Sequence, residues 1–259
     1  MVNFWKIVNS VIEESDLILE VVDSRMPKFS RNEEIEKKIE KQNKKLIIVL
    51  NKCDLVEKDD LDKMKKKLKN SVFVSTKKML GTTILKKKIL SLGAKEKIVV
   101  GVVGFPNTGK SSIINAIAGK NKAKASSYAG FTKGIQKIRA SSRIMLLDTP
   151  GVIPFKENDE SRETIIAAKN PAQLDDPEYI ALEIIKLTDE KSILKTYNIE
   201  YNFTDEIDDD ILEKIAIKKN LLKKGGLANT KDASIIVIKD WQTGKLKPKL
   251  EDLEKQLID

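Results

Sequence analysis

Short runs of apolar, mostly β-branched residues alternate with amphipathic helical stretches from the start of the chain to about residue 150. This alternation is typical of a mostly parallel sheet with helices on both faces. Because Ser141 and Ser142 alone separate the last two runs, these should form an antiparallel hairpin at one end of the sheet. The six predicted strands are Leu17–Val22, Leu46–Leu50, Val72–Val74, Ile98–Val103, Gly134–Ala140 and Arg143–Leu147.

Apolar residues at helical spacing occur at the N-terminus, between the strands and throughout the C-terminal part of the chain. The N-terminal face consists of Phe4, Ile7, Val8, Val11 and Ile12, and a second face, flanked by solvent-facing lysines, consists of Leu61, Met64 and Leu68. After residue 155 the strand pattern stops, and the helical segments are Pro177–Thr188, Asp208–Leu222 and Thr230–Trp241, with Gly225-Gly226 and Gly244 as expected helix terminators. We therefore expect an α/β domain of residues 1–157 and an all-α domain of residues 158–259.

The composition excludes several kinds of chemistry. The chain has no histidine and a single cysteine, Cys53, so His-based catalysis, disulfides and a zinc site are not expected. Its N-terminal segment lacks the features of a cleaved leader, and no stretch approaches the roughly 18 apolar residues of a membrane span. We expect a cytoplasmic protein without a membrane partner.

Positive charge is concentrated in the first part of the chain. The formal charge is +9 overall, which divides into +13 for residues 1–160 and −4 for residues 161–259. Such an excess suits a polyanionic partner such as RNA. Adaptation to high temperature or a biased genome would also produce a chain rich in lysine and glutamate.

A phosphate-binding loop is the most specific motif in the sequence. Residues Gly104 to Ser111 fit the pattern G-x-x-x-x-G-K-S, and they follow an apolar strand and precede a helix, as this motif requires. Backbone N–H groups of such a loop surround the phosphates, Lys110 reaches the β- and γ-phosphates, and the Ser111 hydroxyl holds Mg²⁺. The further nucleotide-binding residues expected here are Asn107, Thr108, Gly109 and Ser112.

Two further segments complete the phosphate side of the expected site. Asp148, at the end of a strand, opens the sequence Asp-Thr-Pro-Gly, so its carboxylate can contact Mg²⁺ through water, while the Gly151 N–H can meet the γ-phosphate. Thr132 lies in the loop between these motifs and could close over Mg²⁺ when the γ-phosphate is present. Lys110, Thr132 and Gly151 are the expected catalytic residues, and Ser111, Thr132 and Asp148 the expected metal ligands.

A guanine-reading motif, Asn51-Lys52-Cys53-Asp54, follows the apolar strand before it. The Asp54 carboxylate can accept two hydrogen bonds from guanine, a fit that adenine cannot make. Lys52 can lay its alkyl stem along the base, and Asn51 can tie this loop to the phosphate-binding loop. A later loop of Ser75, Thr76 and Lys77 can offer a backbone N–H to the guanine oxygen. The predicted ligands are therefore GTP or GDP with Mg²⁺.

These five motifs resemble those of the Ras-like, translation-factor-related GTPases, but their order is rotated because the guanine-reading motifs precede the phosphate-binding loop. The rotation keeps the same sheet when the original chain ends lie close together. The arrangement resembles the YlqF/RbgA family of circularly permuted GTPases, which act in assembly of the large ribosomal subunit. Further likeness lies in Val21–Pro27 with Ser30–Asn32, in Leu221–Gly226 and in Asp240–Leu246.

The resemblance implies an α/β fold, a circularly permuted Ras-like P-loop GTPase domain with a six-stranded, mostly parallel sheet, followed by an all-α C-terminal domain. It also implies a GTP-hydrolysing switch whose partner is the large ribosomal subunit or its precursor, through rRNA, with no DNA partner. The family usually has Pro-Gly before its switch threonine, where this chain has Ala129-Gly130.

Three questions stay open at the level of sequence. Arg25 and Arg31 either contact RNA or pin their own loop. Val152 stands where Ras-like enzymes carry the glutamine that orients water, so hydrolysis should be slow alone and stimulated by a ribosomal partner or by K⁺. Asn107 either helps to bind that K⁺ or shapes its loop. The alternative function is an RNA-binding or ribosome-binding module with structural GTP and little turnover.

Overall fold

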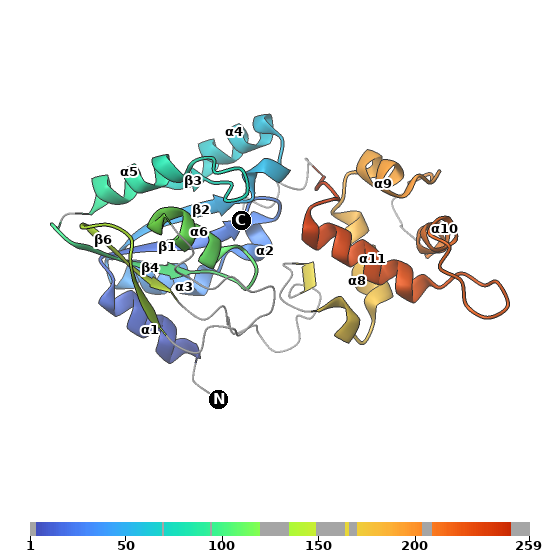
Figure 1. Cartoon of the computed structure of the whole chain (residues 1–259), viewed down its shortest axis with the longest axis horizontal. Helices are drawn as coiled ribbons and strands as arrows, with labels where there is room; N and C mark the ends of the chain where they lie inside the picture. The colour runs from blue at the N-terminus through green and yellow to red at the C-terminus, as the bar shows by residue number, and fades with distance from the viewer. Residues whose placement is uncertain are drawn as a thin grey trace. The chain divides into compact units, whose positions relative to one another are not determined.

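The computed structural model describes residues 4–68, 70–93, 95–119, 135–148, 164–165, 170–203 and 209–249. These described residues form two compact units, which divide in sequence between Glu157 and Asn158. Figure 1 colours both units by residue number. None of the described helices combines the length and the apolar character that a membrane span requires.

The first unit contains a six-stranded sheet in the order β3-β2-β1-β4-β6-β5. Neighbouring strands are parallel except for β5 and β6, which form the expected antiparallel hairpin. The fold class predicted from the sequence is confirmed. The strands are β1 (Leu17–Asp23), β2 (Lys45–Asn51), β3 (Ser71–Phe73), β4 (Ile98–Val103), β5 (Gln136–Arg139) and β6 (Ile144–Asp148).

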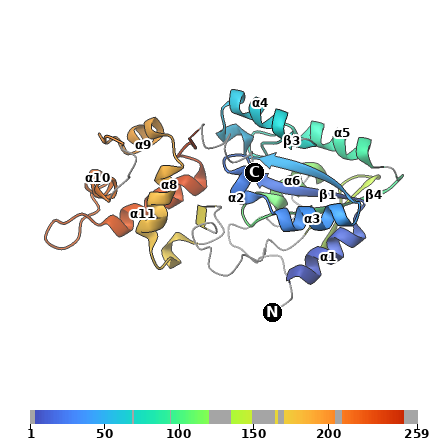
Figure 2. The same ribbon diagram turned by 180° about the vertical axis from the view of Figure 1, so that it is seen from behind.

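Helices cover both faces of this sheet (Figures 1 and 2). The helices among the described residues of the first unit are α1 (Phe4–Glu14), α2 (Pro27–Ser30), α3 (Glu33–Lys41), α4 (Lys58–Lys67), α5 (Thr82–Leu92) and α6 (Lys110–Ala118), with a short 3-10 turn, η1, at Cys53–Leu55. Each follows or precedes a strand, and this alternation allows parallel neighbours in the sheet.

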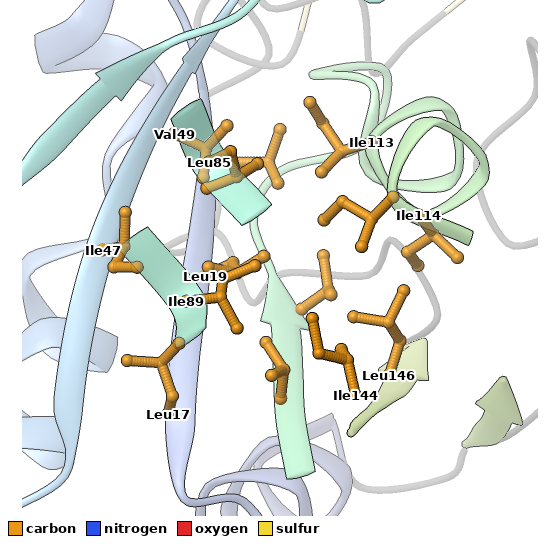
Figure 3. Packing of buried hydrophobic residues seen from close by; sticks show 14 of the residues in the cluster. Leu17, Leu19, Ile47, Val49, Leu85, Ile89, Ile113, Ile114, Ile144 and Leu146 are labelled. Carbon is orange, nitrogen blue, oxygen red and sulfur yellow. The ribbon is translucent and has the colours of Figure 1, made fainter. Parts of the chain in front are cut away.

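Alternate residues of the central strands enter different hydrophobic clusters. Leu17 and Leu19 of β1 pack with α5 and α6 on one face, and Figure 3 shows this cluster with Leu85, Ile113 and their neighbours. Ile18 packs on the opposite face with α1 and α3. Because side chains alternate along a strand, a run such as Leu17–Asp23 can be apolar at most positions and still supply both faces. Packing on both faces fixes the register of the sheet. The edge where the parallel strands end carries the candidate site described below.

The second unit is helical in its described part, with α8 (Pro177–Lys186), α9 (Glu190–Tyr197), α10 (Asp210–Lys218), α11 (Thr230–Thr243) and a 3-10 turn, η2 (Pro171–Gln173). Helix α11 packs against α8 and α10. The indole N–H of Trp241, which is buried, donates to the carbonyl of Ile165 at 2.9 Å. Asp240 is also buried and accepts a 2.6 Å hydrogen bond from Lys245 Nζ. Residues 240–245, one of the segments that resemble the family, therefore stabilise the helical unit through hydrogen bonds of buried side chains.

The structure corrects one part of the sequence prediction in this unit. Gly244 ends α11 in the left-handed conformation as expected, with φ 80°. Gly225 and Gly226 do not end α10, because that helix stops at Lys218 and Asn220 has φ 56°. The two glycines instead form a turn between segments that pair at Leu222 and Ala228. The predicted helix 208–222 is therefore too long at its C-terminal end.

Candidate nucleotide-binding site

The predicted site residues gather where the parallel strands β1, β2, β4 and β6 end. Parallel strands place their carboxyl ends at the same edge of a sheet, which is the usual ligand edge of open α/β folds. In this structure Asp23, Asn51 and Asp148 are the last residues of β1, β2 and β6, and Gly104 directly follows β4. All three side chains are buried.

The phosphate-binding loop runs from Gly104 to the start of α6 and depends on backbone conformations that favour glycine. Gly104 has φ 139°, and a Cβ there would lie 2.4 Å from the carbonyl oxygen of Val21. Gly109 has φ 100°, and its Cβ would lie 2.2 Å from Asn51 Nδ2. Asn107, at φ 60°, adds a third left-handed residue. The loop then enters the N-terminus of α6, where the first N–H groups have no intrahelical acceptors and suit phosphate oxygens.

Lys110 lies inside this loop. Its ammonium donates to the carbonyls of Gly104 and Phe105, each at 2.8 Å, and the residue is 6% exposed. Burial lowers the pKa of Lys110 to about 8, although the nearby Asp148 carboxylate acts in the opposite direction. A buried ammonium beside a phosphate-binding loop is suited to the charge of a nucleotide phosphate, which would favour its protonated form.

Asn51 joins the two halves of the site. Its Nδ2 donates to the carbonyl of Thr108 at 2.8 Å, so the end of β2 is attached to the phosphate-binding loop. The Thr108 hydroxyl in turn donates to the Phe105 carbonyl at 2.9 Å, inside the loop. Asn51 Oδ1 is buried and has no hydrogen-bond partner within the described part of the chain. A buried acceptor of this kind is usually satisfied by a ligand or water, which fits a nucleotide at this edge.

The guanine-reading loop follows directly. Lys52 adopts the left-handed conformation at φ 60°, and η1 then places Asp54, which is half-buried. The Cys53 N–H donates to the Val74 carbonyl at 3.2 Å and so connects this loop to the segment with Ser75, whose backbone pairs with Leu80. Burial raises the pKa of the Cys53 thiol. Thr76 is half-buried and Lys77 exposed in the same turn.

The segment after β1 supports the guanine-reading loop, a role that the sequence analysis did not predict. The Ser24 hydroxyl donates to the Asn51 carbonyl at 2.7 Å, and the Asp23 carboxylate accepts from Lys52 Nζ at 2.7 Å. Arg25 is 1% exposed and pairs with Asp23, so its burial favours loop pinning over contact with RNA. Arg31 pairs with Glu36 at 2.6 Å, also within its own segment.

Only some of the predicted metal-binding and catalytic residues lie among the described residues. Ser111, half-buried in the first turn of α6, and Asp148 supply hydroxyl and carboxylate oxygens, the donors that Mg²⁺ takes together with nucleotide phosphates. Within the described ranges no group of three or more acidic, cysteine or histidine residues could hold a metal ion by itself. Ser112, next in α6, is half-buried. Thr132, Gly151 and Val152 lie outside the described residues.

Comparison with known proteins agrees with this geometry. The model of a family described as 50S ribosome-binding GTPase matches residues 99–258. The chain belongs to this GTPase family. An uncharacterized GTP-binding protein of Methanocaldococcus jannaschii is 45% identical to this GTPase over 258 residues, which cover 96% of this chain and 68% of the relative.

Longer eukaryotic relatives are also similar to this GTPase. The guanine nucleotide-binding protein-like NSN1 of Arabidopsis thaliana is 32% identical, and the alignment covers 94% of this chain and 47% of the relative. The nuclear GTP-binding protein NUG1 of Saccharomyces cerevisiae is 32% identical, with 93% and 54% covered. The chain therefore spans about half the length of these eukaryotic relatives.

A crystal structure of GNP-bound YlqF from T. maritima shows the same fold. It matches this GTPase with a TM-score of 0.66 and 24% identity, covering 95% of this chain and 97% of YlqF. The resemblance to circularly permuted GTPases that the motif order indicated is confirmed by the family match and by this fold.

Proposed function

We propose that this GTPase is a molecular switch that binds and hydrolyses GTP with Mg²⁺ and assists assembly of the large ribosomal subunit. The strongest support is the 2.8 Å hydrogen bond from Asn51 Nδ2 to the Thr108 carbonyl, because it holds a guanine-reading loop beside a phosphate-binding loop. The ribosomal partner is inferred from the family's description and from the formal charge of +13 on residues 1–160.

In this proposal each loop binds one end of the nucleotide. Asp54 accepts two hydrogen bonds from guanine, and Lys110 with the N–H groups at the start of α6 binds the phosphates. Ser111 and Asp148 hold Mg²⁺, which when bound neutralises charge on the β- and γ-phosphates. Thr132 and the Gly151 N–H bind near the γ-phosphate when GTP is present, so their two loops take different conformations with GTP and with GDP.

Nucleotide identity tests the first part of the proposal. Purified protein with Mg²⁺ should bind GDP and GTP in calorimetry and should not bind ADP comparably. In the Asp54→Asn variant an amide N–H replaces a carboxylate oxygen, so GDP affinity should fall and affinity for xanthosine diphosphate should rise. Asp62→Asn, a change at an exposed carboxylate on α4, is the matched control and should leave both affinities unchanged. Equal binding of ADP and GDP by the wild-type protein would refute the assignment.

Sedimentation with large ribosomal subunits tests the second part. Binding should differ between a non-hydrolysable GTP analogue and GDP, and subunits should stimulate phosphate release. RNA binding that is indifferent to nucleotide, with no stimulated release, would instead support a module with structural GTP.

Turnover by the isolated protein should be slow, because a valine side chain at position 152 offers no hydrogen bond to orient the attacking water. Asn107 is a candidate contact for a K⁺ ion that would supply positive charge near the phosphates. Hydrolysis rates in K⁺ and in Na⁺, compared at equal ionic strength, decide this point, and equal rates would remove the ion from the proposal.

A further inference from the structure

The carboxylate of Asp23 has an unusual set of partners at the end of β1. It accepts from Arg25 Nε at 3.1 Å, from Arg25 Nη2 at 2.9 Å, from the Arg25 backbone N–H at 3.0 Å and from Lys52 Nζ at 2.7 Å. Asp23 is 2% exposed and Arg25 is 1% exposed. Two-point pairing with a guanidinium fixes the orientation of a carboxylate more firmly than a single contact does.

The surrounding backbone holds this carboxylate in place. The Asp23 N–H donates to Ser30 Oγ at 3.0 Å, and the Ser30 hydroxyl donates to the Met26 carbonyl at 2.8 Å. Asp23 is also paired in register with Asn51 across β1 and β2. Arg25 therefore orients a carboxylate that is already fixed beside the first residue of the guanine-reading loop.

The carboxylate held in this way binds the side chain of Lys52. Its backbone is left-handed, and its ammonium is attached to Asp23 on the neighbouring strand, so the alkyl stem between them is held at both ends. Burial lowers the pKa of Lys52, while Asp23 opposes that change. The side chain is 23% exposed, so part of it is accessible at the edge of the sheet.

We infer that Asp23, oriented by Arg25, is a positioning residue for guanine, because it fixes the stem of Lys52 as a wall of the base site before the nucleotide binds. This inference rests on the proposed guanine site. Ordering a lysine side chain costs about 1.5–2 kcal/mol of conformational entropy, which corresponds to about a tenfold or somewhat larger change in affinity. Without Asp23, that ordering would take place on binding.

A double-mutant cycle on GDP affinity tests the inference. Asp23→Asn and Lys52→Met should each weaken GDP binding about tenfold, since Lys52→Met keeps an unbranched stem but removes its anchor. In the Lys52→Met background, Asp23→Asn should cause no further loss of affinity. Unfolding in urea without nucleotide, measured for the same proteins, reports the structural cost separately, because removing the Asp23 carboxylate takes a charged partner from the buried Arg25.

The control is Asp16→Asn, at the opposite end of β1. Asp16 also forms an ion pair, with Lys95 Nζ at 2.6 Å, and accepts from the Val99 N–H at 2.9 Å. This variant should lose stability without losing GDP affinity. Should Asp23→Asn fail to fold, Lys52→Arg decides the matter, because its guanidinium can still reach Asp23 and should retain more affinity than Lys52→Met.

The outcomes separate this inference from the proposed function. Wild-type affinity in Lys52→Met, equal affinities in Lys52→Met and Lys52→Arg, or losses that add fully in the double variant would each overturn the positioning role alone. Absence of GDP binding by the wild-type protein would overturn the guanine site itself, and this inference with it.

Discussion

Removing the side chain of Asn51 should weaken both the fold and the nucleotide site. The Asn51→Ala variant loses the 2.8 Å hydrogen bond to the Thr108 carbonyl. Asn51 is 2% exposed, so water cannot readily replace the lost donor. Leaving a buried carbonyl without its partner costs about 1–3 kcal/mol. We expect the free energy of unfolding to fall by about that amount.

The effect on GDP affinity has two parts. Because the bond to Thr108 is present without nucleotide, its loss lowers affinity only as far as the loosened loop must be reordered on binding, which is at most the loss of stability, or about 5- to 150-fold. Loss of the buried acceptor Asn51 Oδ1, which faces the proposed nucleotide site, should lower GDP affinity further. Asn51→Asp should be worse, because a carboxylate would face the Thr108 carbonyl as a second acceptor.

Calorimetric titration with GDP and urea unfolding without nucleotide measure the two quantities separately. The Asp62→Asn variant again serves as the control at an exposed position. Wild-type GDP affinity together with wild-type stability in Asn51→Ala would refute the reasoning. So would an affinity in Asn51→Asp that equals or exceeds the affinity in Asn51→Ala.

Three further predictions follow from the same geometry. Burial lowers the pKa of Lys110 to about 8, so its buried charge costs stability below that pH, and the free energy of unfolding should rise as the pH increases from about 8 to 10.5, the ordinary pKa of lysine. GDP binding should take up a proton at pH 8.5 but not at pH 7 in calorimetry with two buffers. Absence of uptake would contradict the shift. Gly104→Ala should destabilise by more than about 3 kcal/mol, since its Cβ meets the Val21 carbonyl, whereas Gly119→Ala, at φ 79° in open space, should cost about 1–2 kcal/mol in urea unfolding. Trp241→Ala should lower the stability of the helical unit by about 3–5 kcal/mol in thermal unfolding followed by circular dichroism, and an unchanged melting curve would exclude a core role.

The strands and the phosphate-binding loop could be predicted from local sequence alone. A β-branched run such as Ile98–Val103 is buried along most of its length, and the loop after it needs glycine at two positive φ angles. Both signals lie within a few neighbouring residues, so no knowledge of distant contacts is required.

The end of α10 was predicted wrongly because apolar spacing continues past it. Leu221 and Leu222 fit a helical face, yet Asn220 takes a left-handed conformation at φ 56° and the chain turns into a short hairpin. Asparagine adopts this conformation more easily than most residues, and Asn198 ends α9 in the same way. Asparagine after a helical segment was thus an available signal for both ends.

The role of Asp23 could not be read from its own segment. The likeness of residues 21–32 to the YlqF/RbgA family drew attention to the charged residues Arg25 and Arg31. The contact of Asp23 with Lys52, however, depends on β1 and β2 being neighbours in register. That register pairs Asp23 with Asn51, and it depends on β1 and β2 being neighbours, which the strand prediction did not give.

The hydrogen bond from Asn51 to the Thr108 carbonyl joins two parts of the sheet that the permuted order separates along the chain. The predicted guanine-reading residues follow β2 and β3, the phosphate-binding loop follows β4, and the two halves of the sheet adjoin where β1 pairs with β4. That pairing covers Leu17–Glu20, whereas β1 pairs with β2 up to Asp23. The phosphate-binding loop thus begins where the β1–β4 ladder ends, and Asn51 connects the halves beyond that point. A guanine nucleotide bound to both loops would connect the same two halves. GDP and Asn51 should therefore both stabilise the contact between the β1 and β4 halves of the sheet, at its carboxyl edge.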